Sequence, residues 1–398
     1  MTAPAPPAAR RRRLPGRFAL VAATVLVLLH GLPWWVLVLA PGWPTWLFRL
    51  GTGLTVIVLI GFPVSMVRGH GRRGSDPWAI AGDTWLGLIW LLFTWSVIGG
   101  LIDLGLAVAG APTPVGPRLV AVAVLVVVLV LAGWGAVEAR RLPRIRRTEI
   151  TLDRLDAAFD GLRIALLADT HYGPLDRARW SARLVDAVNR LAPDIVAHAG
   201  DLADGSVDRR RAQVAPLGTV RAELARVYIT GNHEYYSGAV PWVEHMAELG
   251  WTVLHNRHLV LQREGAELVL AGVDDLTAAG SGTAGHGADL AAALAGASPG
   301  VPVVLLAHQP KQVRAAMDAG VDLQLSGHTH GGQIWPFHLL VRAEQGALQG
   351  LSRPGERTQL YTTRGAGFWG PPFRVFAPSE ISLLTLRSPS RRRDGSPA

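Results

Sequence analysis

The chain has 398 residues, a formal net charge of +9 and no cysteine. This length is sufficient for two or three domains. Without cysteine the chain has no disulfides, no thiolate metal ligands and no cysteine nucleophile, and its cysteine usage indicates no particular redox compartment.

The positive charge belongs to the first third of the chain. Residues 1–147 contain 15 arginines and 4 acidic residues, whereas residues 148–398 contain 24 basic and 26 acidic residues. A basic excess that flanks apolar stretches is typical of membrane segments and not of a nucleic-acid groove. The sequence therefore predicts a lipid bilayer as a partner and excludes nucleic acid.

Four apolar stretches precede residue 140, and each has about the 20 residues needed to cross a bilayer. They lie at about 17–40, 46–67, 84–109 and 118–137. A cleaved signal peptide would explain one such stretch but not four. Nine of the 14 tryptophans lie in this third, several near segment ends, as interfacial anchors do. We therefore predict a multi-pass membrane region with a basic linker over residues 1–147.

The orientation follows from the arginines. They cluster in the N-terminal tail, in the loop after the second stretch and at the exit from the fourth, while the loops "APGWPT" and "APTPVGP" have none. The positive-inside rule then places both termini and the C-terminal region in the cytoplasm of a plasma-membrane protein. An alternative stays open, because the arginines of "RRRLPGRF" also resemble a twin-arginine export signal.

Asp103 lies inside the third apolar stretch. An intramembrane carboxylate is a candidate ion or proton site. An interfacial or helix-packing role is the favoured interpretation, since the other stretches offer it no evident basic partner.

After the linker, short apolar runs alternate with helical patterns such as "RARWSARLVDAVNRLAP". The strand candidates are 162–169, 194–201, 226–232, 268–275, 301–308 and 323–328. Their nearly continuous hydrophobicity is typical of strands buried on both faces. We predict an α/β domain over residues 148–387, followed by a disordered basic tail at 388–398.

Five of these strands end in a polar residue that can bind a metal. The five are Asp169, Asp201, Asn232, His308 and His328. The carboxyl ends of strands in α/β sheets meet at the ligand-binding edge, so residues far apart in sequence can converge there.

The spacing inside these blocks adds detail. Residues i and i+2 of an extended chain face the same way, so "DTH" presents Asp169 and His171 together, and "HTH" repeats this geometry. Asp201 has two carboxylate oxygens and can bridge two cations. Asn232 and His233 are adjacent and point apart, so that only one of them can be a ligand.

In order, the blocks are D-x-H, G-D, G-N-H-E, H and G-H-x-H, and together they resemble the signature of the calcineurin-like metallophosphoesterases. The resemblance covers about residues 160–385. The stretches "GHTHGGQ" and "GAGFWGPPFRVFAPSEISLLTL" look most like a membrane-associated bacterial branch of that family. The resemblance to this family implies a sandwich of two β-sheets flanked by helices.

The resemblance also implies a role for each residue. Asp169, His171 and His330 would hold one metal, and Asn232, His308 and His328 the other. Asp201 would bridge the two metals. His233 would contact the phosphoryl oxygens or protonate the leaving alkoxide. The cofactors would be two divalent ions, and nitrogen and oxygen ligands without sulfur suit Mn, Fe, Zn or Ni.

These expectations describe a membrane-tethered phosphoesterase that cleaves phosphate mono- or diesters with a metal-activated hydroxide. The tether favours a phospholipid or lipid-linked substrate. The alternative is a membrane transporter or sensor whose metal domain binds a phosphorylated ligand without turnover.

Several polar and aromatic residues stay unassigned. A turn role is favoured for Asp274 and Asp275, and a core role for His198. Four histidines without a matching partner are interpreted as structural or exposed: His255, His258, His286 and His338. Four aromatic residues fit a substrate pocket and ordinary packing equally well: Tyr235, Tyr236, Trp335 and Phe368.

Overall fold

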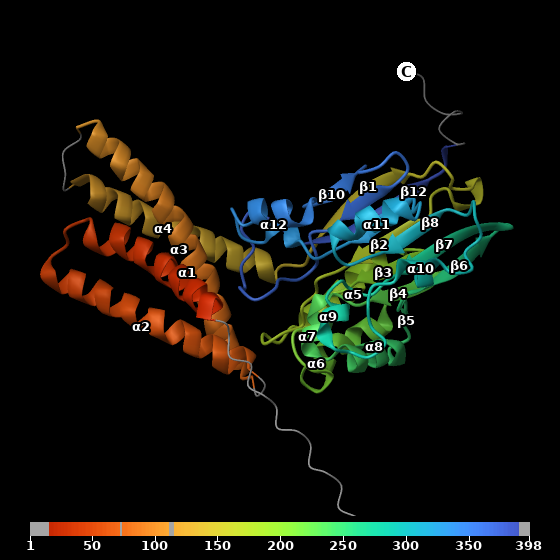
Figure 1. Cartoon of the computed structure of the whole chain (residues 1–398), viewed down its shortest axis with the longest axis horizontal. Coiled ribbons are helices and arrows are strands. Elements are labelled where there is room, and N and C mark those ends of the chain that lie inside the picture. Colours follow the sequence, from red (N-terminus) through yellow and green to blue (C-terminus); the bar gives the residue numbers. More distant parts are fainter. Residues whose placement is uncertain (1–15, 72–73, 111–114, 390–398) are drawn as a thin grey trace, which may run out of the picture. The chain divides into compact units, whose positions relative to one another are not determined.

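The computed structural model describes residues 16–71, 74–110 and 115–389 (Figure 1). The chain divides into two compact units, Met1–Val67 with Leu88–Val130, and Arg68–Gly87 with Leu131–Ala398. The paired arginines of the twin-arginine-like stretch lie outside the described residues, as does most of the tail predicted to be disordered.

The first third of the chain forms four long helices, as predicted (Figure 1). They are α1 (Gly16–Trp34), α2 (Thr45–His70), α3 (Asp76–Val108) and α4 (Val115–Arg140). Each contains a segment long and apolar enough to cross a membrane. A π-helical turn, Trp35–Leu39, continues α1 just after Pro33. Proline removes a backbone donor and crowds the preceding turn, so a local change of helix type is expected there.

The rest of the chain builds two six-stranded sheets. The first has the order β1 (Arg144–Thr151), β12 (Glu380–Arg387), β2 (Arg163–Leu167), β3 (Ile195–Ala199), β4 (Ala225–Ile229) and β5 (Thr252–Val253). The second has the order β10 (Gly350–Ser352), β11 (Gln359–Thr362), β9 (Leu323–Ser326), β8 (Val303–Leu306), β7 (Ala266–Gly272) and β6 (Arg257–Arg263). All six predicted strands are present. In the first sheet β2, β3 and β4 are parallel neighbours, and in the second sheet β7, β8 and β9 are parallel neighbours. Both sets of neighbours matter for function.

Helices connect the strands of both sheets. They are α5 (Ala178–Arg190), α6 (Val207–Val214), α7 (Asn232–Ser237), α8 (Ala239–Glu248), α9 (Ala278–Ser281), α10 (Leu290–Leu294), α11 (Val313–Asp318) and α12 (His338–Gln345). One apolar cluster joins the facing sides of the two sheets, with Leu166, Ile229 and Leu325 among its fully or almost fully buried members. A second cluster packs α5 and α8 on the first sheet, and a third packs α10 and α11 on the second. The result is the predicted sandwich of two sheets flanked by helices.

One strand lies where the sequence predicted a linker. β1 begins at Arg144, inside the basic stretch assigned to residues 1–147, and pairs in parallel with β12. Its first residues are charged and exposed. Charged residues are typical of an edge strand, where they discourage pairing with another chain. The strand therefore carries little of the apolar pattern by which the others are identified.

Candidate metal centre

The carboxyl ends of five strands bring the predicted ligands into one place. Asp169 and His171 follow β2, Asp201 follows β3, and Asn232 opens α7 after β4. His308 follows β8, and both His328 and His330 follow β9. The first sheet therefore contributes four of these side chains and the second sheet three.

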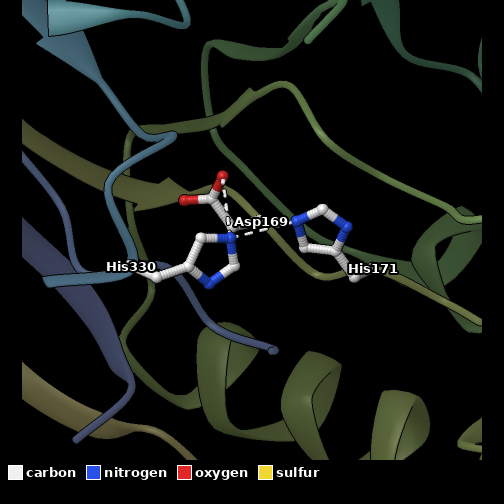
Figure 2. A group of neighbouring side chains, drawn as sticks. All are labelled: Asp169, His171 and His330. Atoms are coloured by element: carbon white, nitrogen blue, oxygen red, sulfur yellow. Dashed lines mark hydrogen bonds and ion pairs between the residues drawn. The ribbon is translucent and has the colours of Figure 1, made fainter. Parts of the chain in front are cut away.

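Asp169, His171 and His330 form one group, with one ligand atom of each within 4.8 Å of the others. Figure 2 shows the rings of His171 and His330 turned toward one another beside the carboxylate of Asp169. The two Nε2 atoms are 3.1 Å apart, and Nε2 of His330 is 3.8 Å from Oδ1 of Asp169. These donors can hold one cation.

Asp201, His308 and His328 form a second group within the same limit. Nε2 of His308 lies 3.2 Å from Nδ1 of His328 and 3.2 Å from Oδ1 of Asn232. The group therefore offers two imidazole nitrogens and two oxygens. Such a set suits a borderline transition-metal ion and fits the predicted metals.

Asp201 stands between the groups. Its Oδ2 is 3.6 Å from Nε2 of His171 in the first group and 3.2 Å from Nε2 of His308 in the second. Its Oδ1 instead accepts the backbone N–H of His233 at 2.9 Å. One oxygen therefore faces both groups, whereas the sequence argument considered a bridge through the two oxygens of the carboxylate.

Five of the seven predicted ligands have a left-handed backbone. The φ angles are 54° for Asp169, 42° for His171, 54° for Asp201, 70° for His328 and 51° for His330. Left-handed conformations are uncommon outside glycine, and they cluster at functional sites. The extended-chain argument for residues i and i+2 is therefore wrong, because these side chains converge through tight turns.

The glycine before His328 permits a close approach. A Cβ at Gly327 would lie 2.6 Å from Cβ of Ala168 and 2.8 Å from Oδ2 of Asp169. The turn after β9 therefore fits against the turn after β2 only without a side chain at this position.

Hydrogen bonds aim the histidines at the groups. Nδ1 of His308 lies 2.7 Å from the carbonyl oxygen of Ala199, and Nδ1 of His171 lies 3.2 Å from Oδ1 of Asp204. When Nδ1 donates in this way, Nε2 keeps a lone pair for a metal. Burial lowers the pKa of His328 to about 3, so its imidazole is neutral, the form that binds cations.

His233 stands beside the first group but is held by a different carboxylate. Its Nδ1 is 2.6 Å from Oδ1 of Asp204. Burial opposes a charge on this imidazole, but Asp201 and Asp204 outweigh burial and raise the pKa of His233 to about 9. These two carboxylates thus favour the protonated imidazole, the form that can donate a proton.

Three residues of the site were missed by the sequence interpretation. Asp204 joins His171 and His233 through one oxygen. Glu234 accepts the backbone N–H groups of Gly231, Asp201 and Leu202, and so joins the start of α7 to the turn after β3. Its place at the third position of α7, three residues after Gly231, is the glutamate half of a capping box and could have identified it.

The third missed residue is Arg374, which is completely buried. It donates to the carbonyl oxygens of His330, Gly367 and Ala377, and its Nη2 is 3.3 Å from Nδ1 of His330. Arg374 thus fixes the segment that carries His330.

The residues left unassigned fall into different places. The rings of Tyr236 and Trp369 lie 5.3 and 5.7 Å from the ring of His233. His198 is fully buried in β3, in agreement with the core interpretation, and Phe368 packs on the Arg177 guanidinium. Two of the histidines predicted to have no matching partner, His255 and His286, both lie against Asp274.

Comparisons with known proteins show what this chain is similar to. A family model described as calcineurin-like phosphoesterase matches residues 162–332. The chain is 39% identical over 269 residues to a transmembrane protein with metallophosphoesterase domain from Danio rerio, which covers 66% of this chain and 62% of that protein. It is 39% identical over 262 residues to an uncharacterized metallophosphoesterase of Helicobacter pylori. This match covers 65% of this chain and 68% of that protein. A solved dimetal phosphatase from Danio rerio has a TM-score of 0.36 at 14% identity, over 57% of this chain and 98% of that one.

The chain folds into an α/β sandwich, and side chains that could hold metal ions meet where its strands end. The chain belongs to the calcineurin-like phosphoesterase family, which confirms the predicted family and fold class. It spans less than two thirds of the length of the zebrafish relative.

Proposed function

We propose that this chain is a membrane-tethered hydrolase of phosphate mono- or diesters that uses two divalent cations. The observation that carries the proposal is Oδ2 of Asp201, which faces two groups of nitrogen and oxygen donors at once. Two cations in such an arrangement supply a nucleophilic water at neutral pH and neutralise charge on the phosphoryl group. The seven predicted ligands would hold them: Asp169, His171, Asp201, Asn232, His308, His328 and His330.

His233 has the properties of the general acid. It lies beside the first group, Asp204 favours its protonated form, and its Nδ1 is held by Asp204, so that Nε2 would face substrate. A proton donated from Nε2 to the leaving oxygen would complete the cleavage of the P–O bond. A sensor that only binds phosphate has no need of this acid, so the His233–Asp204 pair favours the enzyme over the alternative of a transporter or sensor.

The direct test uses the full-length protein in detergent with Mn, Fe, Zn or Ni and soluble phosphate mono- and diesters. We expect metal-dependent release of alcohol and phosphate product. Absence of turnover with every metal, in a protein that still binds two equivalents of metal, would favour the sensor.

Asp204→Asn tests how His233 is held. The amide removes the negative charge that keeps His233 protonated, so the pKa of His233 falls. We expect activity about 10- to 100-fold lower, typical for loss of such a partner, and an alkaline limb of the pH–rate profile at lower pH. Asp208→Asn, at an exposed position on the neighbouring helix α6, is the control. An unchanged alkaline limb in Asp204→Asn would contradict this role for the carboxylate.

The location in the cell belongs to the same proposal. We keep residues 1–147 as a membrane region, 148–387 as the catalytic domain and 388–398 as a tail, in a plasma-membrane protein with both termini and the catalytic domain in the cytoplasm. The support is the arginine distribution, including Arg68 and Arg140 in the last turns of α2 and α4. Protease should cleave the catalytic domain in inverted vesicles and spare it in right-side-out ones, and the reverse pattern would support export.

A lipid-linked substrate is supported by exposed apolar side chains near the site. We call Phe337, Leu339, Leu340, Trp369 and Phe376 the apolar rim, and these residues are 42–62% exposed. The rim is close to the ligands in the chain, since α12 begins eight residues after His330. Hydrogen bonds between Gln333 and Trp369 join its two segments. An apolar surface next to a phosphoester site fits substrates whose acyl chains stay in the bilayer.

The double variant Leu339→Asp, Leu340→Asp tests the rim. Leu339 and Leu340 are 62% and 58% exposed, so burying the rest of each in the bilayer stabilises the bound state by about 1 kcal/mol, and loss of both should lower activity on phospholipid in vesicles about 30-fold. Activity on a soluble phosphodiester should stay the same. Leu351→Asp, at an exposed leucine of β10, is the matched control. Equal losses on the soluble and the vesicle substrate would argue against a lipid substrate.

A further inference from the structure

We propose that His255, Asp274 and His286 form a further cation site, separate from the two groups described above, that takes zinc or a similar transition-metal ion. One ligand atom of each lies within 4.8 Å of the others. His255 lies between β5 and β6, Asp274 follows β7, and His286 lies in the loop between α9 and α10. Three separate segments thus supply the three donors.

The donor geometry is close to that of a tetrahedral site. Nδ1 of His286 is 3.4 Å from Oδ2 of Asp274, and Nδ1 of His255 is 2.7 Å from Oδ1. Ligands about 2.1 Å from a tetrahedral ion lie about 3.4 Å from one another. Small movements of His255 would therefore bring all three donors to bonding distance of one ion.

Two imidazoles that share one carboxylate offer a set of donors for a cation. The ring centroids of His255 and His286 are only 4.4 Å apart. Two protonated rings at this distance would repel each other, and Asp274 has a single charge to offer them. Two neutral rings and one carboxylate form the nitrogen and oxygen set that zinc prefers.

The surroundings fit a bound ion. The Asp274 side chain is only 2% exposed, and its Oδ2 accepts the backbone N–H of Gly287 at 3.0 Å, a partner that orients the ligand. The His255 side chain is 38% exposed, which leaves a path from solvent and a position for a water ligand. Asp274 is thus held in the protein interior, and the site is open to solvent at His255.

This site is connected to the catalytic groups through α7. The hydroxyl of Tyr235 lies 3.0 Å from Nδ1 of His286, a hydrogen bond that an ion bound to Nδ1 would replace, and 3.0 Å from Oγ1 of Thr230. Tyr235 is two residues after His233 in the same short helix. An ion here would fasten the glycine-rich segment 277–290 to the β7 end and against α7, and so would act as a structural clamp beside the active site.

The test measures metal content and the mobility of the clamped segment. The full-length protein in detergent is equilibrated with zinc and its zinc per chain is compared with that of the double variant His255→Ala, His286→Ala. We expect about one zinc ion fewer per chain in the double variant. His258→Ala removes a nearby histidine of β6 that bonds a backbone carbonyl, and should keep the full zinc content.

A second measurement, amide hydrogen exchange, distinguishes loss of the site from misfolding of the variant. Zinc should slow amide hydrogen exchange over 277–290 in the native chain and in His258→Ala, but not in the double variant. Equal zinc content in the double variant and the native chain would overturn the proposal. Failure of the catalytic centre is distinguishable, because it would lower the zinc content of all three proteins equally and leave the difference between them unchanged.

Discussion

Asp201→Asn is expected to lower phosphoesterase activity about a thousandfold and to weaken the retention of at least one metal ion. The substitution removes the negative charge that faces both donor groups, and charge stabilisation of this kind contributes several kcal/mol to the transition state. Asparagine tolerates the left-handed backbone at this position, with φ at 54°, and its side-chain oxygen can still accept the N–H of His233. The loss should therefore reflect the missing charge and not a changed fold.

The measurement is steady-state turnover together with metal content by elemental analysis. Asp208→Asn provides a charge-matched control at an exposed position and should keep both metals and full activity. If Asp201→Asn retained two metals and more than about a tenth of the activity, the bridging role would be untenable.

His233→Gln is expected to show a loss that depends on the leaving group. General-acid catalysis contributes about 10²- to 10⁴-fold where the leaving alkoxide is a poor one. An aryl phosphoester with an acidic leaving group needs little protonation, so its cleavage should fall much less than that of an alkyl phosphoester. Metal content should not change, since His233 is not one of the seven predicted ligands and its Nδ1 is held by Asp204.

The leaving-group series separates proton donation from simple contact with phosphate. His245→Gln, on α8 and paired with Glu248, is the matched histidine control. A loss of equal size for aryl and alkyl substrates would assign His233 to binding of the phosphoryl oxygens, the other role that the family resemblance implies.

The ligands could be predicted from sequence because each follows a recognisable strand. β2, β3, β4, β8 and β9 are apolar runs buried on both faces, and the polar residue after each run stands out. The prediction of how the ligand side chains converge is correct only in part. Strand order brings the turns together, but left-handed residues such as His171 and His330 turn the side chains toward each other. No pattern of polar and apolar residues reports the sign of φ.

Other parts of the site depend on contacts between distant segments. Arg374 lies 44 residues from His330, and Asp274 lies 19 residues from His255, so neither pairing leaves a mark on local periodicity. β1 escaped notice for a different reason, since an exposed edge strand needs few apolar residues. Asp204 could have been predicted from the sequence, because it follows Asp201 by three residues in the same polar turn.

The left-handed ligands also have a consequence for protein engineering. Each one holds a non-glycine residue where glycine would relieve about 1 kcal/mol of backbone strain. Glycine would relieve that strain at Asp169, His171, Asp201, His328 and His330, but it would delete a donor atom at each position and, at Asp201, the acceptor of the His233 N–H. Any library built to stabilise this protein should hold those five codons fixed, because relief of backbone strain there removes the donors of both groups.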